Sequence, residues 1–165
     1  MSTASVQTLA QSFDLGFAQP LGATGHSPLN YLACRVGTES LVICLTDLSG
    51  LQRRGKIVPL RSTVPGLLGV AGIRSRLMPV YRTAILLGLT PAAHPEKWIA
   101  VCGSEDPIGL ALDEFEGYLQ AAATDLSPRG DLDGACPHLR ELLVTGTRTR
   151  PVIQLPSLLQ MIRDR

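Results

Sequence analysis

The 165-residue sequence has little of what marks several common protein classes. Only 4% of its residues are aromatic, and 15 Lys and Arg are balanced by 14 Asp and Glu, for a net charge of +1. Nucleic-acid-binding domains are usually strongly basic, and single-strand binders add stacking aromatics, so this composition argues against both. No apolar run approaches the ~20 residues that span a bilayer. Residues 1–10 lack a basic segment followed by an apolar core, so we expect no secretory signal and a cytoplasmic protein.

The sequence also lacks familiar catalytic and metal-binding patterns. It contains no G-x-S-x-G, no P-loop and no G-x-G-x-x-G after a strand. None of its four cysteines form a C-x-x-C pair, and its three histidines lie in loop-like segments without converging ligands. We therefore expect no enzymatic activity, no cofactor and no metal site. The cysteines are interpreted as buried thiols in a reducing compartment.

Short apolar segments separated by Gly and Pro turns fill most of the chain. They predict a hairpin of residues 31–36 and 40–45, one helical turn at 84–87 that stops at Gly88, and a helix starting at Pro156. Further short strands are expected at 57–60, 67–73, 76–81, 98–102, 108–112, 115–119, 142–144 and 151–155, and a loop at 121–137. Many short strands and almost no long helix indicate an all-β protein of sandwich or barrel type, and two small barrels would fit the two clusters of strands.

The first 28 residues differ in composition from the rest. They are rich in Ser, Thr, Gln and Gly and predict an N-terminal tail that is flexible, with a short helix around residues 6–15 as the alternative. The domain itself is expected to comprise residues 29–165.

Three blocks, taken in order, resemble the CheW-like family. In the first, the family pattern G-h-x-N-h-R-G-x-h-h-P-h (h, apolar) is similar to residues 69–80. The second, h-G-h-h-h-D-x-h, is similar to residues 108–115, and the third is a G-x-R turn at 146–148 followed by an apolar strand and a helix with two leucines. The resemblance covers about residues 31–163. It implies two intertwined SH3-like five-stranded barrels with a short C-terminal helix.

The resemblance implies a non-catalytic adaptor in chemosensory signal transduction. Such proteins couple the cytoplasmic tip of a chemoreceptor to the regulatory domain of a CheA-type histidine kinase, and other CheW-like subunits are further expected partners. No nucleic acid and no membrane insertion are expected. The alternative is a small β-barrel binding module for another ligand, such as nucleic acid. The candidate partner-binding residues are Leu48, Leu51, Leu67, Leu68, Val70, Ile73, Arg74, Leu112 and Phe115.

The chain departs from the family pattern at positions tied to partner contact. Residues 72–75 keep the arginine of N-h-R-G as Arg74 but lose the flanking Asn and Gly. Arg82 stands where the family has an aspartate, and Gly50 where it commonly has an acidic residue. Losing or reversing a charge at a close pair costs about 2–5 kcal/mol at an interface. We therefore expect receptor binding to persist and kinase binding to be weakened.

Overall fold

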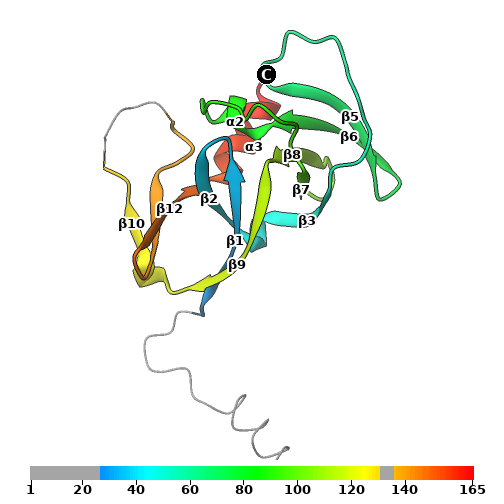
Figure 1. The fold of residues 1–165 in the computed structure, drawn as a ribbon. Helices are drawn as coiled ribbons and strands as arrows, with labels where there is room; N and C mark the ends of the chain where they lie inside the picture. Colours follow the sequence, from blue (N-terminus) through cyan, green and yellow to red (C-terminus); the bar gives the residue numbers. More distant parts are fainter. Residues whose placement is uncertain (1–26, 131–135) are drawn as a thin grey trace, which may run out of the picture.

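The computed structural model describes residues 27–130 and 136–165 (Figure 1). The expected N-terminal tail, with its alternative helix, falls almost entirely on residues 1–26, outside the described residues. Among the described residues, no helix is both long and apolar enough to cross a bilayer.

The described residues form twelve strands and two short α-helices. The strands are β1 (Leu29–Val36), β2 (Glu39–Cys44), β3 (Leu48–Arg53), β4 (Ile57–Val58), β5 (Leu67–Ile73), β6 (Arg76–Arg82), β7 (Trp98–Cys102), β8 (Ile108–Leu112), β9 (Glu114–Ala121), β10 (Leu126–Pro128), β11 (Glu141–Thr145) and β12 (Arg148–Ile153). The helices are α2 (Thr83–Leu86) and α3 (Leu155–Arg163), and two 3-10 turns, η1 (Leu45–Asp47) and η2 (Ala123–Asp125), complete the set.

The strands form two sheets that we call the first and second barrels. The first barrel has the order β10-β11-β12-β2-β1-β9 and the second the order β3-β7-β8-β6-β5-β4. The chain leaves the first barrel after β2, builds the whole second barrel, and returns at β9, which intertwines the two. Each sheet has six strands rather than five because a short strand, β10 or β4, is added at one edge. β10 lies within the expected loop at 121–137, which is therefore not entirely loop.

Local signals in the sequence explain several element boundaries. The expected hairpin is confirmed, with β1 and β2 pairing from Tyr31 and Cys44 to Val36 and Glu39. Gly88 adopts a positive φ of 69° just after α2 and ends it, as the glycine stop predicted. α3 has its proline in the first turn, where the missing N–H costs no helical hydrogen bond.

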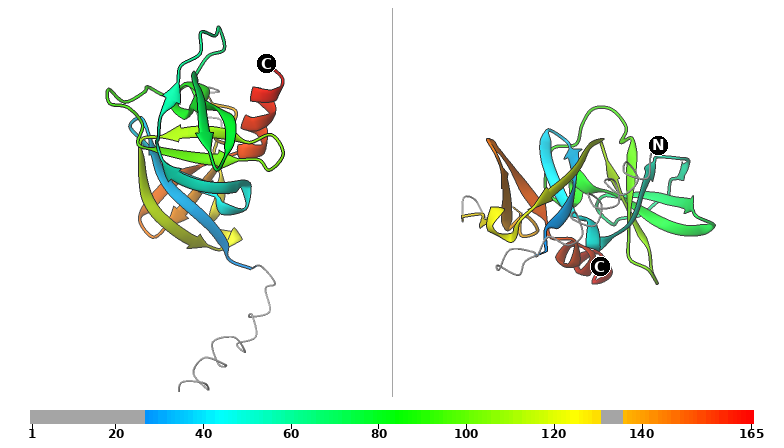
Figure 2. Two further views of the ribbon diagram at one scale, coloured as in Figure 1. Left: turned by 90° about the vertical axis from the view of Figure 1, so that its right-hand side faces the viewer. Right: turned by 90° about the horizontal axis from the view of Figure 1, so that it is seen from below.

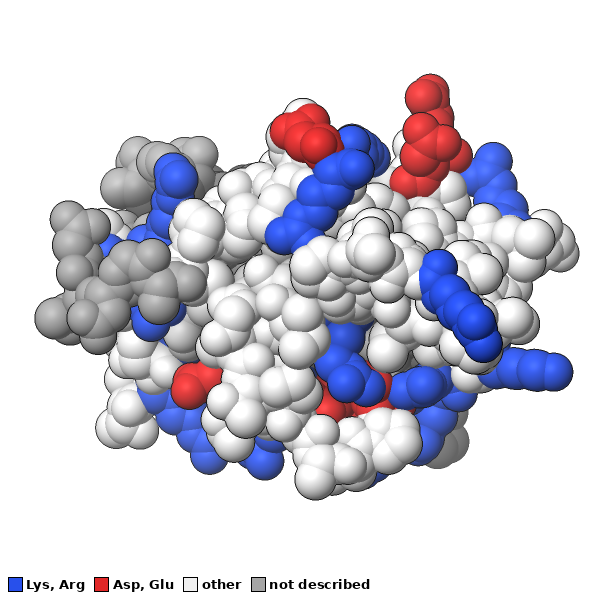
Figure 3. Space-filling model, turned by 90° about the horizontal axis from the view of Figure 1, so that it is seen from above, with Lys and Arg blue, Asp and Glu red and all other residues white. Residues whose placement is uncertain are grey.

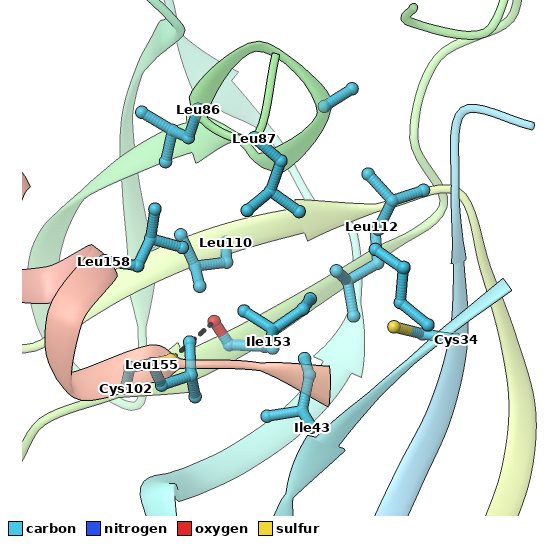
Figure 4. Close-up of a cluster of buried hydrophobic side chains, with 14 of the residues drawn as sticks. Cys34, Ile43, Leu86, Leu87, Cys102, Leu110, Leu112, Ile153, Leu155 and Leu158 are labelled. Atoms are coloured by element: carbon cyan, nitrogen blue, oxygen red, sulfur yellow. Dashed lines mark hydrogen bonds between the residues drawn. The ribbon is translucent and has the colours of Figure 1, made fainter. Parts of the chain in front are cut away.

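The largest hydrophobic cluster lies between the barrels (Figure 4). Leu32 and Ile43 reach it from the first barrel, Leu110 from the second, and Leu155 and Leu158 from α3. Figure 2 shows α3 beside the junction of the two β lobes. Smaller clusters fill the interior of each barrel. Because the largest core is shared, the two barrels are expected to unfold together rather than as separate domains.

Candidate functional site

Aromatic side chains connect β9, an edge strand of the first barrel, to β7, which pairs with the edge strand β3 of the second barrel. The ring of Phe115 on β9 lies 5.5 Å from that of Trp98 on β7 and 5.1 Å from that of Tyr118, in both cases edge to face. The guanidinium of Arg53 lies 5.1 Å from the centre of the Trp98 ring. Leu48 and Leu51 of β3 pack, partly buried, against the same shared core as Trp98 and Phe115.

We call Leu48, Leu51, Trp98, Phe115 and Tyr118 the junction surface. Tyr118 is 63% exposed, while the other four are partly buried. Edge-to-face aromatic pairs contribute about 0.5–1.5 kcal/mol each beyond simple burial, so these rings are held in place. Rigid, partly exposed aromatics are typical anchors of protein–protein interfaces because little side-chain entropy remains to be lost.

The structure brings three of the predicted partner-binding residues, Leu48, Leu51 and Phe115, to this surface. Leu112 was predicted beside them but has no exposed surface. Its strand, β8, is buried along its whole length because it lies between β7 and β6 with both faces covered. Leu112 is therefore a core residue and cannot touch a partner in this conformation. Trp98 and Tyr118 were not predicted, because no local pattern shows that both rings contact Phe115.

The other predicted residues lie on β5 and the turn that follows it. Leu67, Leu68 and Val70 are half-buried on a strand with neighbours on both sides. Ile73 is only 2% exposed and belongs to the core of the second barrel, packed in one cluster with Met78. Ile73 therefore offers almost no exposed surface of its own, and its place in a partner-binding surface stays a prediction. Alternation along the strand turns Gly72 outward and Ile73 inward.

Arg74 lies at the tip of the β5–β6 hairpin in a strained turn. Arg74 and Ser75 both have positive φ, at 50° and 62°, as a two-residue turn between Ile73 and Arg76 requires. Each non-glycine residue in this region costs about 1–2 kcal/mol. The turn carries the arginine across to β3, where its Nη1 donates to the Ser49 carbonyl oxygen at 3.2 Å.

A model of the CheW-like domain family matches residues 30–164. The chain belongs to the CheW-like domain family. A crystal structure of the scaffolding protein TtCheW from Thermoanaerobacter tengcongensis superimposes with a TM-score of 0.69 over 77% of this chain and 89% of that one, at 13% identity. At this identity, the match shows the fold alone, two SH3-like barrels. No curated protein matches the chain. Family membership supports a general role as a chemotaxis signalling adaptor, and members are non-catalytic scaffolds.

One departure from the CheW pattern, Arg82, has a partner within the chain. Its Nε donates to Glu96 Oε1 at 2.5 Å, and Arg54 Nη1 donates to Glu96 Oε2 at 2.8 Å. The Glu96 side chain is only 5% exposed, whereas those of Arg54 and Arg82 are 27% and 35% exposed. The reversed charge at Arg82 is thus paired with Glu96, whose single negative charge it shares with Arg54. Sequence reasoning missed Glu96, although a charge reversal is itself a reason to search for a compensating acid.

The aspartate of the second CheW block has a structural role. Asp113 is buried, and its Oδ2 accepts a hydrogen bond from the Gly37 N–H at 2.6 Å. This bond satisfies a buried carboxylate oxygen and ties the start of the first barrel's β1–β2 turn to the return from the second barrel. The block is therefore a fold signature in this chain.

His138 and Ser157 form a side-chain pair of the kind found in catalytic triads. His138 Nδ1 lies 2.9 Å from Ser157 Oγ, but its Nε2 faces the Met161 sulfur at 3.3 Å. A catalytic triad needs an acid at that second nitrogen to orient the ring and stabilise its protonated form. Burial, assisted by the charges of Arg140 and Arg165, lowers the pKa of His138. The arrangement fits a packing contact between α3 and the segment before β11 better than a nucleophile–base pair.

Proposed function

We propose that the chain is a cytoplasmic adaptor that holds the tip of a chemoreceptor on its junction surface. The observation that carries this proposal is the aromatic connection Trp98–Phe115–Tyr118, which crosses both barrels and leaves Tyr118 exposed. A receptor tip is a helical hairpin, and a helix docks by setting regularly spaced apolar side chains against an apolar surface. The rigid rings and the two β3 leucines supply such a surface.

We further propose that binding to a CheA-type kinase is weaker than binding to the receptor. Gly50 removes an acidic side chain from β3, and the Arg74 guanidinium lies in its place, with Nη2 2.5 Å from the position that a Gly50 Cβ would occupy. A partner whose own positive charge pairs with the acidic residue of other family members would instead face the Arg74 guanidinium. Like charges brought together at an interface cost several kcal/mol. Pairing with further CheW-like subunits stays part of the proposal.

The nucleic-acid alternative has less support. Figure 3 shows Lys and Arg side chains scattered over the upper face, separated by uncharged surface and acidic groups. Arg35, Arg54, Arg82 and Lys97 are each paired with a carboxylate. Paired cations release fewer counterions from a phosphate backbone, so they contribute less to nucleic-acid affinity.

Calorimetric titration tests the proposal directly. The purified chain is titrated with the receptor tip and then with the kinase regulatory domain from the same pathway. We expect receptor binding that Tyr118→Ala weakens by about tenfold or more, because exposed aromatic anchors carry much of the interface energy. Val144→Ala is the matched control, since Val144 is an exposed apolar residue on β11 outside the junction surface.

The outcomes separate the parts of the proposal. Binding of neither partner would refute the adaptor function. Receptor binding that Tyr118→Ala and Val144→Ala leave equally strong would retain the function and refute the junction surface. Kinase binding as tight as receptor binding would refute the proposed weakening.

A further inference from the structure

Two arginines converge at one end of the second barrel. Arg74 in the β5–β6 turn and Arg76 at the start of β6 line a notch of about 210 Å³, together with Ser49 of β3 and Ser104 of the β7–β8 turn. The remaining wall is largely apolar, and among the residues that the structure describes no Asp or Glu contributes to it. Small-molecule sites usually occupy ~300–1,000 Å³, so this notch fits a single side chain better than a cofactor.

The guanidinium groups of Arg74 and Arg76 each use one nitrogen in a hydrogen bond to a backbone carbonyl oxygen and retain further N–H donors. Arg74 Nη1 donates to the Ser49 carbonyl oxygen at 3.2 Å, and Arg76 Nη1 donates to the Ser104 carbonyl oxygen at 2.8 Å. In the described part of the chain, neither arginine lies within 4.0 Å of a carboxylate oxygen, although Glu105 and Asp106 line an adjoining cavity with Arg76. The carbonyl bonds fix the two side chains in place and leave their other N–H groups available to an acceptor.

The backbone of the turn supports a functional interpretation. Arg74 and Ser75 retain positive φ where glycine or asparagine would fit with less strain. Strain of this kind persists at binding sites because the surrounding structure holds it. Here it presents the Arg74 guanidinium across Gly50, where a side chain would displace it.

We propose that this notch is a carboxylate-binding site that accepts an Asp or Glu side chain of a partner protein between Arg74 and Arg76. The planar guanidinium pairs with a carboxylate through two parallel hydrogen bonds, and such charge-assisted bonds are about twice as strong as neutral ones. The partner thus supplies in trans the negative charge that β3 lacks at Gly50. The inference deepens the adaptor function proposed above and rests on it for the identity of the partner.

A first experiment needs no natural partner. The arginine Nε–Hε signals of the labelled chain are followed by NMR during titration with a blocked tri-glutamate peptide, a tri-glutamine peptide and inorganic phosphate. We expect saturable shifts of Arg74 and Arg76 with tri-glutamate alone. Any side chain at position 50 displaces the Arg74 guanidinium, so both Gly50 variants should reduce the Arg74 shifts. The reduction should be larger in Gly50→Glu, which also supplies an internal carboxylate to Arg74, than in Gly50→Gln, which has the same bulk. No shift, or an equal response to phosphate, would overturn a carboxylate site.

A second experiment uses the receptor tip and the kinase regulatory domain. Gly50→Glu should weaken binding of the partner that uses the notch by about tenfold relative to Gly50→Gln, and Arg74→Gln should reduce the salt dependence of binding while Arg74→Lys retains it. Equal melting temperatures of the two Gly50 variants serve as the folding control. Binding by the unmodified chain that neither Gly50→Glu nor Arg74→Gln alters would refute the notch and retain the adaptor. Arginine shifts with tri-glutamate but no binding of either protein would refute the adaptor and retain the notch.

Discussion

Replacing Glu96 with glutamine measures what the buried charge cluster contributes to stability. The substitution keeps the shape of the side chain and removes the charge that Arg54 and Arg82 share. Hydrogen bonds to charged groups contribute about 1.5–3 kcal/mol each, and breaking a fully buried pair costs about 3–5 kcal/mol. The two guanidinium groups are 27% and 35% exposed, so water recovers part of their solvation. We therefore expect a net loss of about 2–3 kcal/mol.

The assay is thermal unfolding followed by circular dichroism. For a chain of this size a loss of 1 kcal/mol lowers the melting temperature by about 2–4 °C, so Glu96→Gln should melt about 5–10 °C below the unmodified chain. Glu114→Gln is the matched control, because Glu114 pairs with Lys97 at the surface and should leave the melting temperature nearly unchanged.

Arg82→Asp extends the same test. It places a second carboxylate beside Glu96 and should destabilise the chain more than Glu96→Gln. If Glu96→Gln melts with the unmodified chain, or if Arg82→Asp is harmless, the cluster does not stabilise the fold and the account of Arg82 is wrong.

Three further predictions concern the turn, the core and the thiols. Ser75→Gly should raise the free energy of unfolding by about 1 kcal/mol in urea titration, because glycine adopts a φ of 62° without strain; no gain would mean that the turn is unstrained. The Ile73 side chain is 2% exposed and that of Leu77 is 80% exposed, so Ile73→Glu should abolish the cooperative melting transition and Leu77→Glu should leave it intact. Equal melting temperatures of the two variants would show that Ile73 is not a core residue. Burial raises the pKa of Cys102 from 9.0 to about 12 and that of Cys34 as well, so the folded chain retains protons that the unfolded chain releases above about pH 9. Stability should therefore fall as pH rises beyond that point, and an unchanged unfolding free energy between pH 8 and pH 10 would contradict it.

Local patterns sufficed for most of the secondary structure. The alternation and turn residues of the 31–45 hairpin, the glycine after α2 and the proline at the start of α3 each act over a few neighbouring residues. The order of the three CheW blocks was enough to place the chain in its family, which the match over residues 30–164 confirms. Leu48, Leu51 and Phe115 were placed at a candidate surface by the same resemblance.

Only the tertiary structure decided which faces are covered. Alternation shows that Ile73 and Ala71 share a face of β5, but their burial depends on β6, β7 and β8 closing over that face. The sequence around Leu112 does not show whether this strand residue is buried, because its burial follows from the position of β8 between β7 and β6.

The amino-acid sequence by itself determined most of the strands and turns, because these follow from interactions between near neighbours, and its three blocks indicated the family. β3 and β10 were not among the expected strands. The sequence did not determine the junction surface, which joins Trp98 of one barrel to Phe115 and Tyr118 of the other. Nor did it reveal that Glu96 pairs with both Arg54 and Arg82, which lie 42 and 14 residues away along the chain. Both features join residues that lie far apart along the chain, and contacts between such distant residues leave no periodic signal in the sequence.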